Sequence, residues 1–346
     1  MNSPNTGSKS RSFLYLWAFG AAFSAVFTVL IWLLGPNLKY FLDSLLPDQG
    51  SSWYYWKLPT REFWDMVIVW IFYLGHQFSI WVAIYLGQRN LRKFRSLALW
   101  GLPKYCVVAL VINLVFIFLH LLQTHLWFDG LAQDVPIMTS QGSVIIMLAI
   151  LLILENPRRG LLLGIKASRP FTARVTDFFK RSHPYIFAWA LVYTFWFHPM
   201  ATDPQLLSGF FYMFLLFTQV TLAWTPAHFK KWWIVLLESY VTIHAVIVAV
   251  FNTSFFDSPV MWPMFLSGFA FMFVFTYLYA FKTNRAIYWV VTAVYVLFLA
   301  WLYLPAPLGY GREIMNLARL EFLWIPIILH ALAALFAGLA YLKIRK

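Results

Sequence analysis

Residues 64–87, WDMVIVWIFYLGHQFSIWVAIYLG, form an apolar run long enough to cross a lipid bilayer as one helix. About 20 apolar residues are needed to span the hydrocarbon core. The run carries Asp65 at one end and His76 near its middle, eleven residues apart. At 3.6 residues per turn these two side chains share one helix face, with Ser79 a turn further on. Ionisable groups inside a membrane are costly, so this pair is the first functional candidate.

The composition of the whole chain indicates an integral membrane protein. Of its 346 residues, 62% are hydrophobic, 21% aromatic and only 11% charged, which is unlike a soluble domain. The net charge of +13 does not predict nucleic-acid binding, because the basic residues occupy short segments between apolar spans. The single cysteine, Cys106, excludes an intrachain disulfide framework, a CxxC redox pair and covalent c-type haem attachment.

We predict an all-α, polytopic bundle of about ten transmembrane helices that forms a single domain over residues 1–346. Each span is close to the length that a bilayer requires. Residues 1–12 form a polar cytoplasmic tail, and the apolar run that follows is a retained span rather than a cleaved signal. The predicted spans are residues 13–34, 64–87, 97–122, 136–154, 184–201, 204–224, 232–251, 260–281, 286–304 and 317–342.

The distribution of Lys and Arg predicts the orientation. Counted over alternate connections, 21 of them lie on the side of the N-terminus and five on the other. Basic residues favour the cytoplasmic side, so both termini are expected inside. The expected setting is a multi-pass protein in a bacterial-type inner (plasma) membrane, with the lipid bilayer as its partner and no nucleic acid.

Two connections are more than turns. The cytoplasmic connection over residues 155–183 alternates basic and apolar residues, as in FTARVTDFFKR, which predicts an amphipathic helix on the anionic inner leaflet. A protein-docking site is the alternative. The outer connection over residues 35–63 contains WYYW at residues 53–56, which indicates an interfacial aromatic belt or, as the alternative, a substrate-entry lid.

A faint internal repeat divides the chain into halves of five spans, residues 1–202 and 203–346. His76 and His244 fall in the second span of each half, and His198 and His330 fall in the fifth. Halves of five spans are inverted relative to each other, as in many secondary transporters.

His76 and His330 lie at similar depths in spans that both begin outside. Arg319 precedes His330 by eleven residues, as Asp65 precedes His76, so each pair is expected on one helix face. If the second and tenth spans are neighbours, Asp65 pairs with Arg319 while the two histidines face each other. These four residues are the predicted catalytic group.

A second group contains His120, His198 and His244, with Asn113 and Thr124 on the face of His120. Histidine suits axial ligation of b-type haem, transition-metal binding and acid–base chemistry. His76, His330, His198 and His244 are therefore candidate haem or cofactor ligands, and His120, His198 and His244 a candidate metal site. The alternative is that each histidine bonds a backbone carbonyl or a neighbouring helix, at a gain of about 0.6 kcal/mol per bond.

Two further carboxylates, Glu238 and Glu321, extend these candidates. Glu238 lies six residues before His244 and so points to a different face, whereas Glu321 is expected to pair with Arg319 or Arg312. The leading hypothesis is a membrane enzyme or redox protein that acts on an apolar, membrane-dissolved small molecule such as a lipid or quinone. A transporter or channel with a proton or ion path through Asp65, Glu238 and Glu321 is the second reading, and a non-catalytic membrane subunit the third.

Overall fold

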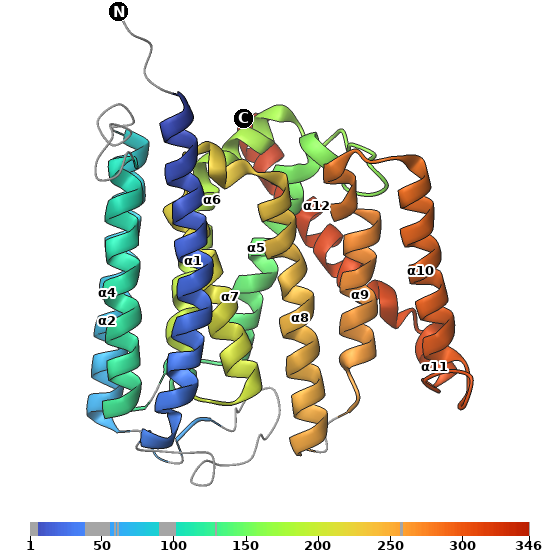
Figure 1. The fold of residues 1–346 in the computed structure, drawn as a ribbon. Helices are drawn as coiled ribbons and strands as arrows, with labels where there is room; N and C mark the ends of the chain where they lie inside the picture. Colours follow the sequence, from blue (N-terminus) through green and yellow to red (C-terminus); the bar gives the residue numbers. More distant parts are fainter. Residues whose placement is uncertain are drawn as a thin grey trace, which may run out of the picture. The chain divides into compact units, whose positions relative to one another are not determined.

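The computed structural model describes residues 6–38, 56–58, 60, 62–89, 102–128, 130–256 and 259–345. Regular structure in these ranges is helical, and an isolated bridge joins Leu162 to Ile165 (Figure 1). The α-helices are α1 (Thr6–Leu34), α2 (Phe63–Arg89), α4 (Lys104–Leu126), α5 (Ile137–Arg159), α6 (Ala173–Phe197), α7 (Pro204–Thr221), α8 (Lys231–Phe256), α9 (Trp262–Phe275), α10 (Arg285–Tyr303), α11 (Ile314–Ala318) and α12 (Trp324–Arg345). Short 3-10 turns are η1 (Gly35–Asn37), η4 (Leu131–Gln133), η5 (Pro226–Phe229), η6 (Tyr277–Phe281) and η7 (Glu321–Leu323).

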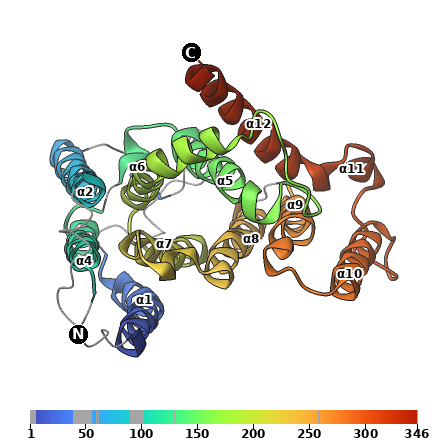
Figure 2. The same cartoon turned by 90° about the horizontal axis from the view of Figure 1, so that it is seen from above.

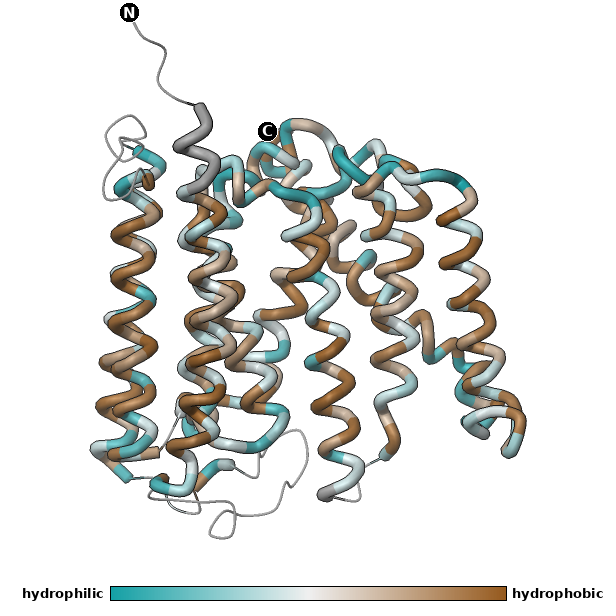
Figure 3. Tube along the Cα trace, viewed as in Figure 1, coloured by the Kyte–Doolittle hydropathy of each residue, from teal (hydrophilic) through white to brown (hydrophobic). Residues whose placement is uncertain are grey.

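Eight helical segments in the described residues are long and apolar enough to cross a membrane. Hydrophobic residues fill the middles of the helices and hydrophilic ones gather mainly at their ends (Figure 3). The predicted all-helical fold is therefore confirmed, and the eight segments indicate a multi-pass membrane protein. The eight segments are Ser12–Asn37, Phe63–Arg89, Lys104–Leu126, Ile137–Arg159, Lys231–Ser254, Trp262–Phe281, Arg285–Tyr303 and Glu321–Ile344.

The other two predicted spans, residues 184–201 and 204–224, correspond to the C-terminal part of α6 and to α7. Both segments are helical, but α6 begins with a charged stretch and α7 carries Gln205 and Gln219 among its 18 residues. α6 continues through Pro184, where we expected a span to begin, so the helix joins the amphipathic stretch directly to the apolar one. Residues 160–172 precede it without forming an α-helix.

The chain packs as two compact units. The first unit combines Met1–Val144 with Pro184–Phe229, and the second combines Ile145–His183 with Lys230–Lys346. Each unit draws on segments from before and after residue 202, so the packing does not divide the chain at the boundary of the predicted halves. The inverted repeat stays a prediction.

Within the first unit, α4 packs against α2 and α7, and α7 also packs against α1 (Figure 2). The α1–α7 contact combines a small residue with aromatic rings, as expected where membrane helices approach closely. Gly20 lies against Thr218, and Phe27 meets the edge of Phe214 at a ring-centroid distance of 5.3 Å. Of the aromatic group at residues 53–56, only Trp56 lies among the described residues, and it is buried.

Within the second unit, α9 contacts α8, α10 and α12. Tyr295 of α10 donates a hydrogen bond to the backbone oxygen of Ser267 at 3.2 Å, and a Cβ on Gly268 would come within 3.0 Å of Ile325. α9 is thus held on one side by a polar contact and on another by close packing.

The last predicted span, residues 317–342, is interrupted. α11 ends at Ala318, Leu320 has a φ of 57°, and α12 begins at Trp324. A left-handed residue turns the chain out of a right-handed helix, so Arg319 does not lie on the helix of His330. The predicted shared face of these two residues is wrong.

Adding one methyl group to Gly20 is expected to destabilise the first unit. A Cβ there would lie 2.3 Å from Oγ1 and 2.9 Å from Cβ of Thr218, and overpacking costs about 1–3 kcal/mol. The matched change Gly142→Ala meets no atom within 4 Å and should stabilise by about 0.5–1 kcal/mol, because alanine loses less backbone freedom. Thermal unfolding in detergent should show a lower Tm for Gly20→Ala and an equal or higher one for Gly142→Ala. Equal shifts would contradict the close α1–α7 contact.

Candidate functional site

His76 occupies a buried aromatic cage inside the first unit. Its side chain projects from α2 and has no exposed surface. The Phe116 ring of α4 stacks on the imidazole at 4.6 Å with an interplanar angle of 5°, and the Phe217 ring of α7 lies at 5.4 Å. Asp65 is buried on the same helix, which confirms that the two residues share one face. Asp65 sits in the first turn of α2, where the helix dipole favours a negative charge.

Two hydrogen bonds hold both ring nitrogens of His76. The indole N–H of Trp196 donates to Nδ1 at 3.2 Å, and Nε2 lies 3.2 Å from Oδ1 of Asn113. An indole nitrogen can only donate, so Nδ1 is the acceptor and the hydrogen sits on Nε2. His76 is therefore a neutral imidazole in a single tautomer that donates toward Asn113.

The Asn113 end of this network opens on a small cavity. Asn113 Nδ2 donates to Oγ1 of Thr221 at 3.3 Å. Both residues line a space of about 20 Å³ between α1, α4 and α7, which is room for about one water molecule. Its other walls are mostly apolar, among them Leu16, Phe23 and Phe214. A polar path thus runs from the cavity through Asn113 to His76.

His120 extends the network toward the end of α6. Its Nε2 faces the backbone oxygens of His198 at 2.8 Å and Phe195 at 3.1 Å, so this nitrogen carries a hydrogen. Its Nδ1 lies 2.9 Å from the side-chain amide of Gln123, and its ring centroid is 4.4 Å from that of Trp196. Trp196 therefore contacts both buried histidines of the first unit.

Asn113 and Thr124 are buried on α4 together with His120, which confirms their predicted common face. Thr124 Oγ1 donates to the backbone oxygen of His120 and accepts from the backbone N–H of Met200, at 2.9 and 3.1 Å. His198 meets His120 through its backbone carbonyl, while its own Nδ1 lies 3.0 Å from the backbone oxygen of Thr194. These contacts close the C-terminal end of α6 onto α4.

His330 belongs to the second unit, whereas His76 belongs to the first. Its Nδ1 lies 2.8 Å from the backbone oxygen of Pro326, and its Nε2 lies 3.0 Å from that of Leu161. The loop that contains Leu161 also bonds to the end of α9, because Leu163 N donates to Phe275 O at 2.7 Å and Thr276 Oγ1 donates to Leu161 O at 3.0 Å. His330 thus anchors a connecting loop.

A buried ion pair joins α5 to α8 in the second unit. Two guanidinium nitrogens of Arg159 donate to the two carboxylate oxygens of Glu238 at 2.5 and 2.7 Å. Both residues are 2% exposed, and the guanidinium also lies 4.7 Å from the ring centroid of Tyr277. Sequence reasoning counted Arg159 among the surface cations of a connection. The sequence did contain a signal for this ion pair. Glu238 is a carboxylate inside a predicted span, and such a carboxylate requires a cationic or hydrogen-bonding partner.

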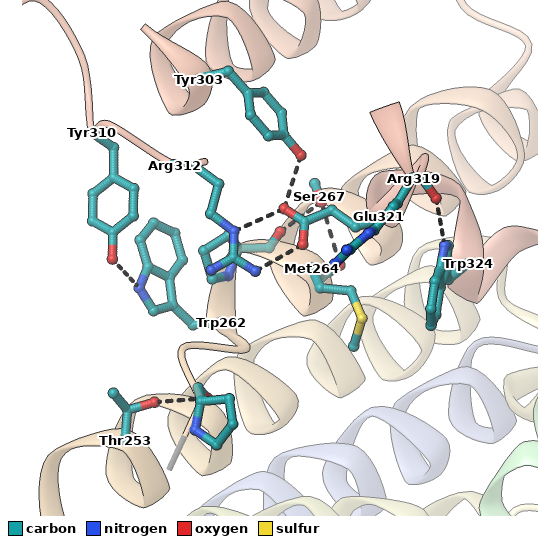
Figure 4. A network of polar contacts seen from close by, with 12 residues as sticks. Thr253, Trp262, Met264, Ser267, Tyr303, Tyr310, Arg312, Arg319, Glu321 and Trp324 are labelled. Atoms are coloured by element: carbon teal, nitrogen blue, oxygen red, sulfur yellow. Dashed lines mark hydrogen bonds and ion pairs between the residues drawn. The ribbon is translucent and has the colours of Figure 1, made fainter. Parts of the chain in front are cut away.

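A second ion pair confirms one of the predicted partners of Glu321 (Figure 4). Arg312 donates from Nε and from an Nη to the two carboxylate oxygens at 3.0 and 2.8 Å, and Tyr303 donates to the same carboxylate at 2.8 Å. The hydrogen bonds of Arg312 to Glu321 raise the pKa of Arg312 above its ordinary value. Arg319 instead contributes its backbone oxygen to the indole N–H of Trp324.

The hydrogen bonds that His76 and His120 already make disfavour their binding to a haem iron or a metal ion. A haem or metal would have to displace Trp196 or Asn113 from His76, and a carbonyl or amide from His120. In the part of the chain that the structure describes, no three His, Cys, Asp or Glu residues are grouped to hold a metal ion. His244 lies half-buried on α8 of the second unit, whereas His120 and His198 belong to the first. The haem and metal hypotheses stay predictions.

The fold and these sites define an all-helical protein that has eight candidate membrane spans in its described residues and polar networks buried among apolar helices. Comparisons with protein families, with curated proteins and with solved structures find no match to the chain. The functional argument therefore rests on the residues of this chain.

Removing one partner of the Arg159–Glu238 pair is expected to cost more than removing both. Glu238→Gln leaves a buried guanidinium without its counter-charge, which costs about 3–5 kcal/mol, whereas an apolar replacement of both partners is close to neutral. The Tm in detergent should fall for Glu238→Gln and recover in the double variant Arg159→Met/Glu238→Leu. Asp177→Asn is the control, because Asp177 pairs with Lys180 in an exposed site. If the double variant melts no higher than Glu238→Gln, the pair does not act as a unit.

Proposed function

We propose that the protein is an integral-membrane enzyme that acts on an apolar, membrane-dissolved substrate such as a lipid or quinone. His76 is its hydrogen-bonding and acid–base group and works without haem or metal. The observation that carries this proposal is the cage in which Trp196 and Asn113 hold a neutral imidazole beside the cavity between α1, α4 and α7.

The arrangement resembles that of an oriented catalytic group. A catalytic imidazole works best when one nitrogen faces the reacting atom and a partner fixes the other. Trp196 fixes Nδ1, and Nε2 points toward Asn113, whose side chain lines the cavity. The cavity has room for about one water molecule, so Asn113 must move aside before a substrate oxygen can take the place of its Oδ1 and accept the Nε2 hydrogen bond. A donor placed where negative charge develops, in a site from which water is excluded, lowers the barrier of acyl or enol chemistry.

The proposal includes ten spans with both termini inside. Its support is the excess of Lys and Arg on one set of connections and the helical state of α6 and α7. If all ten segments span the membrane, Thr202 between α6 and α7 lies on the outer side. If α6 and α7 do not span it, Thr202 lies on the cytoplasmic side. An impermeant thiol reagent should label Thr202→Cys in intact cells, while the native Cys106 is buried and stays unlabelled. Labelling that requires permeabilised cells would contradict the ten-span topology.

The activity is tested by the lipid and quinone content of cells that produce the protein. A species that the wild type forms or depletes, detected by mass spectrometry of the extracted membranes, should return to the empty-vector level in His76→Gln. His125→Gln is the matched control, because His125 lies on α4 and bonds the backbone oxygens of Leu121 and Leu34. Equal loss in both variants would indicate damage to the fold.

An absorption spectrum with metal analysis separates the cofactor-free proposal from its rivals. We expect purified protein without a Soret band or a stoichiometric transition metal. A haem or metal that is lost in His76→Ala or His330→Ala would restore the ligand hypothesis.

Transport is the second candidate, favoured by the ion pair that Arg159 and Glu238 form within α5 and α8. Proton flux into proteoliposomes that ends with Glu238→Gln and persists in His76→Gln would select it over the enzyme.

A further inference from the structure

Three cations line an open surface hollow in the second unit, called the cavity below, and the proposed enzyme site does not use it. Arg174, Lys180 and Arg181 of α6 line it together with Asp177 and with Ile344 of α12, and its volume is about 660 Å³. All five residues belong to the second unit.

The charged side chains share the exposed side of an amphipathic helix. Val175 and Phe179 are buried, whereas Arg174, Asp177, Lys180 and Arg181 are exposed. Lys180 lies 3.1 Å from Asp177, so the carboxylate lies beside one of the three cations. The five lining residues carry a formal net charge of +2, which suits a singly or doubly charged anion.

The membrane depth of the cavity indicates which anion reaches it. Ile344 is the last residue of the candidate span Glu321–Ile344. The end of a span marks the level at which hydrocarbon gives way to headgroups. Anionic phosphates of the lipids lie at this level and attract Lys and Arg. Guanidinium groups match phosphate oxygens with paired hydrogen bonds, and two of the three cations are arginines.

We infer that this cavity binds the phosphate of an anionic phospholipid headgroup, held by Arg174 and Arg181, with Ile344 at the beginning of its acyl chains. A free phosphate offers the same chemistry, but the end of α12 places the cavity beside the bilayer. The inference needs a membrane-embedded chain and does not depend on the enzymatic role of His76.

Native mass spectrometry of the full-length protein tests the site. Phosphatidylglycerol or phosphatidylcholine is added to protein in mild detergent, and the bound lipid is counted. The wild type should prefer phosphatidylglycerol. Arg174→Gln/Arg181→Gln should weaken its binding by about fivefold for each cation removed, the factor that roughly 1 kcal/mol per basic residue implies.

Lys282→Gln/Arg285→Gln is the matched control, because it removes the same charge from exposed residues of the same unit. Its binding should equal that of the wild type. Equal weakening in both double variants, or equal binding of the two lipids by the wild type, would overturn the inference. Inorganic phosphate at millimolar concentration should not displace the lipid, and displacement would assign the cavity to a soluble phosphate instead.

Arg174 and Arg181 are exposed, so folding should survive their replacement, which an unchanged elution volume and Tm would verify.

Lys180→Gln is the milder variant. Its loss of binding should be smaller than that of Arg174→Gln, because Asp177 already offsets the charge of Lys180. A larger effect of Lys180→Gln would contradict the assignment of the phosphate to the arginines.

Discussion

Apolar surroundings cannot hydrogen-bond a polar group, so polar groups within membrane helices must find partners inside the protein. This constraint explains how the chain uses its histidines. The ring nitrogens of His125 and His330 face backbone oxygens, His120 faces two backbone oxygens and an amide, and His76 lies between an indole and an amide. The same constraint draws the Glu238 carboxylate onto Arg159. These polar groups are therefore hydrogen-bonded or ion-paired to partners within the same unit.

The fold could be predicted from the sequence wherever hydropathy alone decides it. Eight of the predicted spans reappear as apolar helices, because a run of that length has no other stable form in a bilayer. The breaks were not predictable. Leu320 adopts a left-handed conformation without being glycine, and Thr276 ends α9 by donating to Leu161, more than a hundred residues earlier in the chain. Such breaks depend on distant partners, which a local pattern does not contain.

The candidate site was foreseen in part. Helical spacing correctly grouped Asp65 with His76, and Asn113 and Thr124 with His120. Helical spacing could not identify Trp196 as a partner of His76. The chain has 18 tryptophans, and a tryptophan in a membrane protein is ordinarily expected at the membrane–water interface. Nor could spacing identify Arg159, which follows the last apolar residues of a span and resembles a flanking charge. Both act across helices, and the relative rotation of two helices is set by packing.

The loop that follows Arg159 has a consequence for synthesis of the protein. Gly160 and Gly164 turn it with φ values of 76° and 74°, and it bonds to Phe275, Thr276 and His330. Its bond to His330 spans 169 positions of the chain. Chains emerge from the ribosome N-terminus first, so the loop can bond to Phe275 and Thr276 before it can bond to His330 of the last helix. Completion of the second unit is thus a late event, and a chain truncated before α12 would lack the contact of His330 with Leu161.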